Sequence, residues 1–223
     1  MNRSKLYISG GGAALLASAL IAASLTGGTA TATAAGQQAA QAGPRAETRT
    51  YFGSLNNSGV RGKGEVDVNH RHLDIDIDAR GLVKGMPHAQ HIHFGAQARH
   101  ECPSADDDTG RDDHRLTTSE GAPAYGPVRV SLTTSGATGP GSVLAVSRFP
   151  AATNGTIHYD RQTRTTKAVA RAIRRGEGVV VIHGVDYNNN GKYDVRGAGK
   201  SDLDPNLPAE ATDPAACGVL HVR

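Results

Sequence analysis

Leu73–Asp78 has the sequence LDIDID, a strict alternation of branched apolar side chains with aspartates. Successive side chains of a β-strand point to opposite faces, so this stretch predicts a strand with one face in a core and the other in water. Asn69–Arg71 separates it from a second strand-like segment, Gly64–Val68, and predicts a hairpin connection. His70 and His72 are therefore expected to be solvated residues at this turn.

Other short apolar segments, bounded by Gly, Pro and Asn, predict further strands at 49–55, 128–133, 142–146, 156–159, 179–182 and 217–222. Lys167–Arg175 predicts a helix, because Val169 and Ile173 share one helical face and Thr165 or Thr166 can cap its start. Residues 96–125 are polar and lack a sustained period, which predicts a long loop. The sequence thus predicts an all-β domain with long loops and one short helix near 167–175.

The first residues have the layout of a secretory signal peptide. Arg3 and Lys5 form a positive start, an apolar run over 13–25 follows, and the small residues ATA stand at 32–34. The apolar run is too short to span a bilayer. We therefore expect a signal peptide over 1–34, a flexible Ala-, Gln- and Gly-rich spacer over 35–48, and a β domain over 49–223 that is secreted or held in the cell envelope.

The charge balance argues against two classes of partner. Of the 24 basic residues, 22 remain without Arg3 and Lys5, and 21 acidic residues nearly balance them. Such a chain offers no general attraction to nucleic acid or to an anionic membrane surface. Aromatic residues are scarce, with 3 Phe, 6 Tyr and no Trp, whereas Gly is abundant at 28, which favours short strands and turns over a helical bundle.

The chain has two cysteines, Cys102 and Cys217. In an exported protein an even number of cysteines predicts a disulfide. Such a bridge would close a loop of more than a hundred residues and tie the segment after 87–95 to the C-terminal strand.

Pro87–Gly95 has the sequence PHAQHIHFG and carries the chemistry of the chain. In an extended backbone His91 and His93 lie on one face, while Ile92 points to the other and suits a buried sheet face. Two imidazoles on one face can hold a single metal ion. The sequence therefore predicts half of a metal site within this strand.

His183 is the best candidate for a third ligand. It ends the continuous apolar run VVVI at 179–182, which predicts a buried strand, and Gly184 lets another part of the chain approach closely. Three neutral imidazoles with one open position suit either copper or zinc.

The spacing His88-x-x-His91-x-His93-x-Gly95, with Cys102 nine residues after His93, resembles the copper-binding core of the copper/zinc superoxide dismutases. VVIH at 180–183 resembles that family's later ligand-bearing strand, and ACGVL at 216–220 resembles its C-terminal cysteine strand. The resemblance covers residues 50–223 as an order of motifs, and the set is more specific than any single motif.

This resemblance implies a Greek-key β-sandwich or flattened barrel. It implies that copper is bound by His91, His93 and His183, that His88 supports the site from behind, and that Cys102 pairs with Cys217. The implied reaction is superoxide dismutation, in which copper cycles between two oxidation states.

The sequence departs from that family at the zinc site and at the entrance for substrate. Asp108 stands where the bridging histidine is expected, and only His114 is available in the loop that follows, so a zinc pattern is incomplete or absent. Asp108 and His114 are candidates for an additional metal. Pro214 replaces the arginine that steers superoxide, which implies weaker capture of this small anion.

AQHIHFG at 89–95, with a helix that leads through Gly176 into a Val-rich strand ending at His183, is similar to the CHRD domain. That module is a comparable β-sandwich with no established catalysis, and its terminal GEIRG strand is absent here. As the alternative, it implies a non-catalytic binding or envelope module whose histidines are packing and hydrogen-bonding residues, with His183 far from His91 and His93 or with all three blocked by side chains.

Asp186–Asp194 has the sequence DYNNNGKYD and matches the first half of a calcium-binding loop. The candidate ligands are Asp186, Asn188, Asn190 and Asp194. Gly197 stands at the twelfth position, where a bidentate acid is expected, and Asp202 or Asp204 beyond it can substitute. The alternative is an Asn/Gly-rich turn after a strand.

Overall fold

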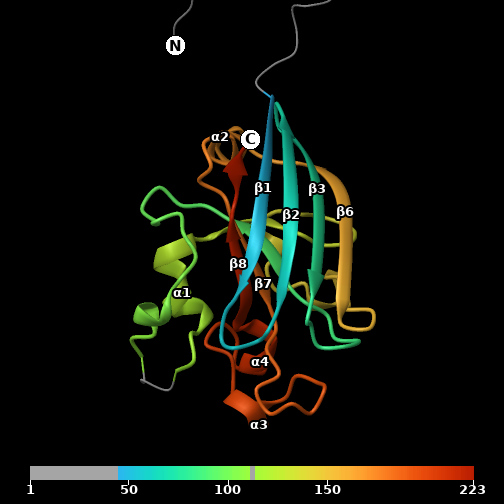
Figure 1. Ribbon diagram of the computed structural model, residues 1–223, viewed down its shortest axis with the longest axis vertical. Coiled ribbons are helices and arrows are strands. Elements are labelled where there is room, and N and C mark those ends of the chain that lie inside the picture. Colours follow the sequence, from blue (N-terminus) through green and yellow to red (C-terminus); the bar gives the residue numbers. More distant parts are fainter. Residues whose placement is uncertain (1–44, 111–113) are drawn as a thin grey trace, which may run out of the picture. The chain divides into compact units, whose positions relative to one another are not determined.

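One curled antiparallel sheet organises residues 45–110 and 114–223, the part of the chain that our computed structural model describes (Figure 1). The expected signal peptide over 1–34 and the start of the expected spacer lie outside these residues. The strands are β1 (Arg45–Ser54), β2 (Arg61–Asn69), β3 (His72–Arg80), β4 (Gln90–His93), β5 (Val128–Ser131), β6 (Thr156–Arg164), β7 (Val179–His183), β8 (Pro214–Val219) and β9 (His221–Val222).

The strand order is β5-β4-β7-β8-β1-β2-β3-β6, and β9 pairs with β1. After β3 the chain forms the antiparallel pair of β4 and β5, which a long loop connects. It then returns to place β6 beside β3 and places β7 beside β4. Crossings of this kind between the two halves of an antiparallel sheet are typical of Greek-key folds. The predicted all-β class, a Greek-key sandwich or flattened barrel, is confirmed.

The LDIDID alternation forms β3 as expected. Leu73, Ile75 and Ile77 are buried, and they lie across from apolar residues of β2, with Val66 opposite Ile75 and Val68 opposite Leu73. Fully burying one such side chain stabilises the fold by about 1.5–3 kcal/mol. Asn69 pairs with His72, so the connection is a two-residue turn in which the φ of His70 is 55°. The predicted hairpin is thereby confirmed.

β4 and β7, like most of the adjacent β8, are buried on both faces. Ile92, Val180 and Ile182 face the main core between the two halves of the sheet. Val179 and Val181 face the opposite way and belong to a second, smaller apolar cluster with Tyr125 and Cys217. Loops that follow β4 and β7 therefore cover the outer face of these strands.

Two expectations about the sheet are wrong in detail. β1 begins at Arg45, before the predicted start at 49, because Thr48 is buried and pairs with Val66 of β2 and Val222 of β9. The predicted strand at 142–146 is instead a pair of short 3-10 turns, η2 (Pro140–Ser142) and η3 (Val146–Arg148). Val143 is half-buried, whereas Leu144 and Val146 are exposed, and the segment does not join the strand ladder.

The predicted helix is present as α2 (Lys167–Arg174), capped by Thr166 and buried at Val169 and Ile173. Further short helices lie in the loops. These are η1 (Ala105–Asp107), α1 (Thr118–Tyr125), α3 (Val195–Ala198) and α4 (Ala209–Thr212). α1 lies inside the segment predicted as a loop, and its start has a capping box between Thr117 and Glu120.

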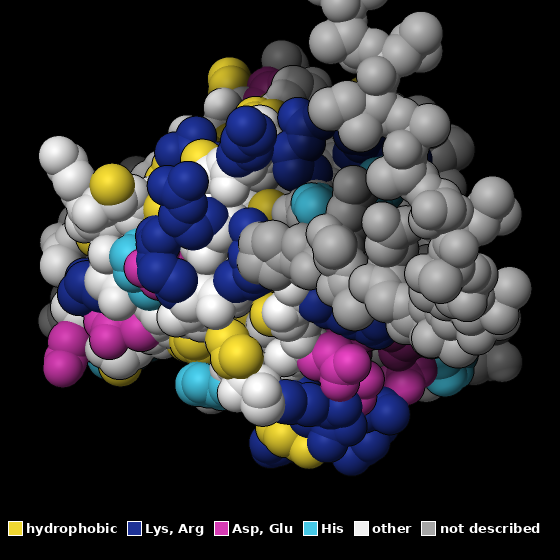
Figure 2. All heavy atoms as spheres, turned by 90° about the horizontal axis from the view of Figure 1, so that it is seen from above, with side chains coloured by type: hydrophobic (Ala, Val, Ile, Leu, Met, Phe, Trp, Pro, Cys, Tyr) yellow, Lys and Arg dark blue, Asp and Glu magenta, His cyan; other side chains and the backbone are white. Residues whose placement is uncertain are grey.

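Figure 2 shows the end of the domain at which α2 lies, and Lys and Arg side chains are prominent on it. α2 contributes Lys167, Arg171 and Arg174. Arg175, which follows the helix, pairs with Glu177. Basic residues in the last turn of a helix interact favourably with the negative end of its dipole, so part of this charge stabilises α2 itself.

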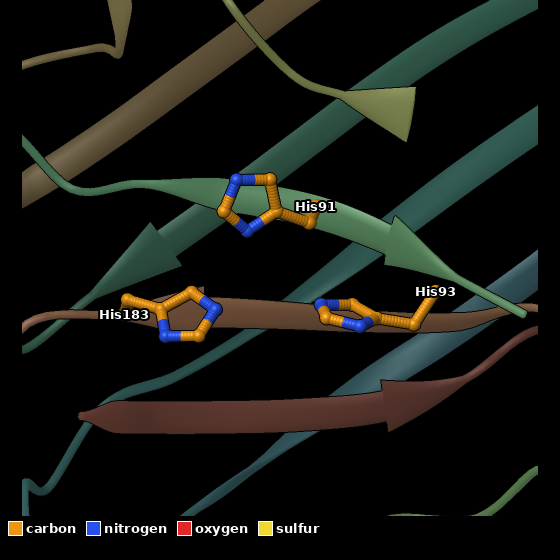
Figure 3. A group of neighbouring side chains, drawn as sticks. All are labelled: His91, His93 and His183. Carbon is orange, nitrogen blue, oxygen red and sulfur yellow. The ribbon is translucent and has the colours of Figure 1, made fainter. Parts of the chain in front are cut away.

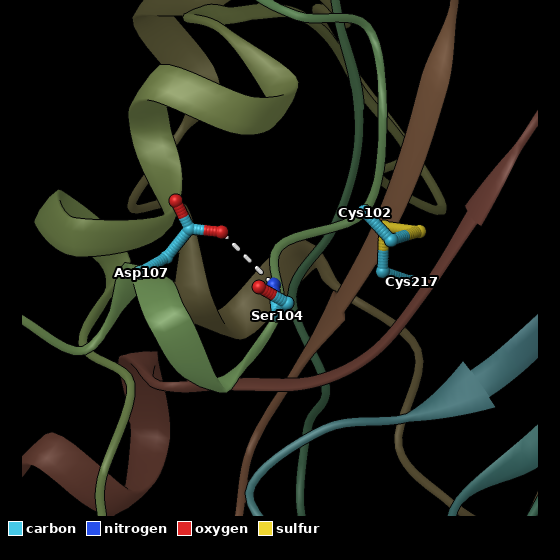
Figure 4. Close-up of a disulfide and its surroundings, with 4 residues drawn as sticks. All are labelled: Cys102, Ser104, Asp107 and Cys217. Atoms are coloured by element: carbon cyan, nitrogen blue, oxygen red, sulfur yellow. Dashed lines mark hydrogen bonds between the residues drawn. A yellow bond between two sulfur atoms is a disulfide. The ribbon is translucent and has the colours of Figure 1, made fainter.

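The predicted disulfide is present between Cys102 and Cys217, at a sequence separation of 115 (Figure 4). Cys217 lies in β8 beside Val181 of β7, and Cys102 lies in the loop after β4. Nearby, Ser104 begins η1 and its backbone N–H donates to Asp107 at 2.9 Å. The bridge therefore fixes the start of the loop that carries α1 onto the outer face of the sheet.

We expect Cys102→Ala/Cys217→Ala to lower the free energy of unfolding by about 4 to 5 kcal/mol, the loop-closure entropy for a separation of this size. Urea denaturation of the variant and of the oxidised wild type measures the difference. A difference below about 1 kcal/mol would contradict this role, because the loop would then be held by its other contacts.

Candidate metal centre

Three histidines converge on the outer face of the sheet. β4 supplies His91 and His93, and β7 supplies His183 from the adjacent strand (Figure 3). One nitrogen from each ring lies within 4.8 Å of the others, and each residue is at most 3% exposed. The period-two alternation of β4 explains why two imidazoles share this face while Ile92 enters the core.

Each imidazole is oriented by a backbone carbonyl. The bonds are His91 Nε2 to Val143 O at 3.2 Å, His93 Nδ1 to Gly126 O at 2.7 Å, and His183 Nδ1 to Thr212 O at 2.5 Å. A carbonyl oxygen only accepts, so these ring nitrogens carry the proton and donate. The second nitrogen of each ring is then left with a lone pair.

These second nitrogens are Nδ1 of His91, Nε2 of His93 and Nε2 of His183, and all three are buried without a hydrogen-bond partner. Buried polar atoms are rarely left unpaired, and a cluster of them indicates a missing ligand. Metal-binding histidines characteristically donate their other ring N–H to a carbonyl or carboxylate. The residues present therefore fit a metal ion.

Burial keeps the three imidazoles neutral. It lowers the pKa of His93 from 6.5 to about 3 and the pKa of His183 to about 4. The pKa of His91 falls well below 6.5, because of burial and then because of the neighbouring rings of His183 and His93. Neutral imidazole is the form that binds metal, so protons compete poorly with a metal at this site.

His88 contacts the backbone of His183 and of Val83. Its Nδ1 donates to the carbonyl of His183 at 2.8 Å, and its Nε2 accepts the N–H of Val83 at 3.1 Å. Gly184 has a φ of 111°, and a Cβ there would overlap the hydroxyl of Tyr193. Gly184 thus leaves room for the side chain of Tyr193, whereas the sequence predicted the close approach of another stretch of backbone.

A cavity of about 210 Å³ leads to the three rings. Aromatic side chains pack against two of them, with Phe149 edge-on to His91 at a centroid distance of 5.2 Å and Tyr125 beside His93 at 4.5 Å. The cavity leaves one side of the centre open, so a bound metal would keep a position for a further ligand.

Asp108 and His114, proposed for an additional metal, line one surface pocket of about 720 Å³. Oδ1 of Asp108 is buried without a partner, whereas His114 is exposed. Among the described residues, one group of three or more His, Cys, Asp or Glu side chains is close enough to hold a metal ion. That group is His91, His93 and His183, and it does not include Asp108 or His114. The additional site, and any zinc in it, stays a prediction.

The four candidate calcium ligands lie in one tight turn, where their side-chain oxygens accept hydrogen bonds from within the turn. The oxygens are those of Asp186, Asn188, Asn190 and Asp194. The fully buried Glu210 anchors this turn, since it accepts the backbone N–H of Tyr187 and of Asp194 and packs against Gly197. The arrangement agrees with an Asn/Gly-rich turn, and calcium binding stays a prediction.

The sequence did not identify the three carbonyls that orient the histidines. Each follows or ends a short helix: Gly126 after α1, Val143 after η2 and Thr212 at the end of α4. The last carbonyls of a helix lack intrahelical partners and are free to accept from an imidazole. The Thr117–Glu120 capping box was the one signal in the sequence for any of these helices.

No protein-family model matches this chain, and a search of curated proteins finds no significant match. None of the helices among the described residues is long and apolar enough to cross a membrane. What is shown is an all-β protein with one disulfide and a buried three-histidine cluster that can hold a metal ion.

Metal affinity should be nearly independent of pH between about pH 5 and about pH 7, because the pKa values of about 3 and about 4 leave His93 and His183 neutral. An imidazole with a pKa of 6.5 would instead lose about 30-fold in affinity over this range. Metal titration at both pH values, with an unstructured three-histidine peptide as control, measures the difference. A loss of about 30-fold or more for the protein would contradict burial as the cause.

Proposed function

We propose that this chain is an exported copper-binding protein that holds one copper ion through His91, His93 and His183. The observation that carries the proposal is the convergence of three buried ring nitrogens with no hydrogen-bond partner. Removing such atoms from water costs free energy, which a bound metal ion offsets. The signal-like segment over 1–34 supports export.

Copper is favoured over zinc by two arguments. A nitrogen site without geometric selection binds Cu²⁺ more tightly than the other divalent first-row metals. The spacing of His88, His91, His93 and Cys102 resembles the copper core of the copper/zinc superoxide dismutases, as does the placement of His183 at the end of a buried strand. When bound, copper supplies one-electron chemistry by cycling between two oxidation states.

The protein's own residues hold the rings in place for this ion. Backbone carbonyls of Gly126, Val143 and Thr212 fix which nitrogen of each ring is free. His88 holds the backbone of His183 from the other side. Because strands and helix ends supply these contacts, the three nitrogens are arranged before any metal arrives.

Purified, oxidised protein should bind one equivalent of copper, and His91→Ala/His93→Ala should weaken binding by about 1000-fold or more, because two of three ligands are lost. His72→Ala is the matched control, since His72 is exposed at the end of β3. Elemental analysis and copper titration measure both. Stoichiometric copper in the double variant, or none in the wild type, would refute the proposal, and preferential zinc loading would reassign the metal.

Superoxide dismutation is the reaction that the resemblance implies, and the cavity sets an expectation for its rate. No Lys or Arg lies among the residues that line the cavity within the described ranges. Pro214, in place of the steering arginine, is buried at the start of β8. Electrostatic steering of an anion requires a fixed positive field at the entrance.

If the copper-loaded protein dismutates superoxide, its rate constant should not fall as ionic strength rises. Screening reduces a rate only where opposite charges steer the encounter. Pulse radiolysis at low and high salt measures this, with free copper as the baseline. A steep fall with salt would reveal a steering cation, and a rate no higher than that of free copper would remove dismutation as the function.

The alternative is a non-catalytic CHRD-like binding module. It implies that the histidines lie apart or are blocked by side chains, whereas one nitrogen of each ring lies within 4.8 Å of the others and all three residues line a cavity. Histidines used for packing alone would be expected to have both ring nitrogens satisfied. This geometry supports the metal site over the alternative.

A further inference from the structure

The cavity in front of the three histidines is walled by apolar side chains from several loops. They include Pro127, Leu144, Val146, Phe149, Leu203 and Leu207. Across the described ranges, its lining contains no Lys, Arg, Asp or Glu. A charged ligand would lose its hydration here without gaining an ion pair.

Apart from the three histidines, the buried polar side chains of the lining are already hydrogen-bonded. The hydroxyl of Tyr125 donates to Thr118 O at 2.7 Å, and that of Thr118 donates to Thr212 O at 2.6 Å. The hydroxyl of Thr212 donates to Ser201 at 2.8 Å. Of the buried side-chain atoms without partners in the described chain, only the nitrogens of His91, His93 and His183 belong to lining residues. Within the described residues, the buried unpaired side-chain atoms that a ligand meets in this cavity are therefore those of the three histidines.

The mouth of the cavity is apolar as well. Six large hydrophobic side chains are exposed in the described residues, and three of them, Leu144, Val146 and Leu203, line this cavity. They are 38%, 37% and 43% exposed. Single exposed apolar residues are common, but a cluster at the entrance of a pocket marks a binding site.

An acidic side chain, that of Asp202, lies beside this cavity. Asp202 accepts the backbone N–H of Ser119, a lining residue, at 2.7 Å. Its carboxylate also acts on His183, where it raises the pKa against the larger effect of burial. An acidic group at this position repels anions and leaves neutral molecules unaffected.

We infer that this cavity binds neutral, apolar molecules of about one ring, such as phenols and azoles, whose single polar head points at the histidine centre. The volume of about 210 Å³ exceeds the roughly 150 Å³ that holds benzene in an apolar cavity, so a substituted ring fits. In part this inference rests on the proposed function, because a bound copper ion would receive the head group. In the metal-free chain the unpaired nitrogens accept a hydrogen bond from the same group.

The first experiment uses the metal-free, oxidised chain with p-cresol and benzoate, a neutral and an anionic ring of similar size. We expect p-cresol to shift the amide NMR signals of Ala122, Leu144 and Ala211 in a saturable way, and benzoate to bind at least about tenfold more weakly. Equal binding of the two probes, or saturable shifts confined to other surfaces, would overturn the inference. This experiment does not depend on copper.

The second experiment uses the copper-loaded chain with imidazole and 4-phenylimidazole, followed by the copper absorption and electron paramagnetic resonance spectra. Burial of the phenyl ring should make 4-phenylimidazole bind about tenfold more tightly or better. Leu144→Lys should remove most of this advantage and strengthen azide binding, whereas Val195→Lys, an exposed apolar position outside the cavity, should change neither. Circular dichroism confirms that both variants are folded.

The two experiments separate the cavity from the metal. p-Cresol binding without copper binding would sustain the cavity and overturn the proposed function. Copper binding with no preference for the phenyl group would sustain the proposed function and overturn the inference about the cavity. Self-association that Leu144→Lys abolishes, with no p-cresol binding, would identify the mouth as a protein interface and overturn this inference.

Discussion

The structure depends on the alternation of side chains along one short strand. β4 is only four residues long, Gln90–His93, and it must send Ile92 into the main core while His91 and His93 face the other way. A shift of one residue would exchange the two faces, placing imidazoles among the apolar side chains of the core. Pairing with β7 fixes the register, since Ile92 lies across from Val180 and His91 from Val181.

The outer face of β4 and β7 would be exposed to solvent without the loops that cover it. The loops that cover it bring three short helices, η2, α1 and α4, whose ends present carbonyl groups to the imidazoles. This contact satisfies two needs together, because a helix end requires a donor and each ring requires an orienting acceptor. The disulfide between Cys102 and Cys217 holds the first of these loops on the sheet. Fold and candidate centre are thus stabilised by the same covering layer.

That layer also determines what reaches the centre. The side chains that it places around the histidines are mostly apolar and its buried hydroxyls are hydrogen-bonded, so the buried side-chain atoms of the cavity that lack a partner among the described residues are imidazole nitrogens. A site of this character differs from one built to attract an anion, even where the ligand spacing resembles a dismutase. The same three ligands can therefore serve different chemistry according to the loops around them.

Period-two patterns along the chain determined the strands, the hairpin at 70–71 and the shared face of His91 and His93, because alternation is a local property of an extended backbone. Local signals also identified α2 and the pairing of two cysteines in an exported chain. Tertiary structure decided the rest. Segment 142–146 has the composition of a strand, yet next to the edge strand β5 it follows the 3-10 turn η2 and forms turns, and the Val143 carbonyl accepts from His91. His183 approaches His91 because β7 pairs with β4. The apolar walls of the cavity form because loops that are distant in the sequence pack together. No local pattern in the sequence encodes either contact.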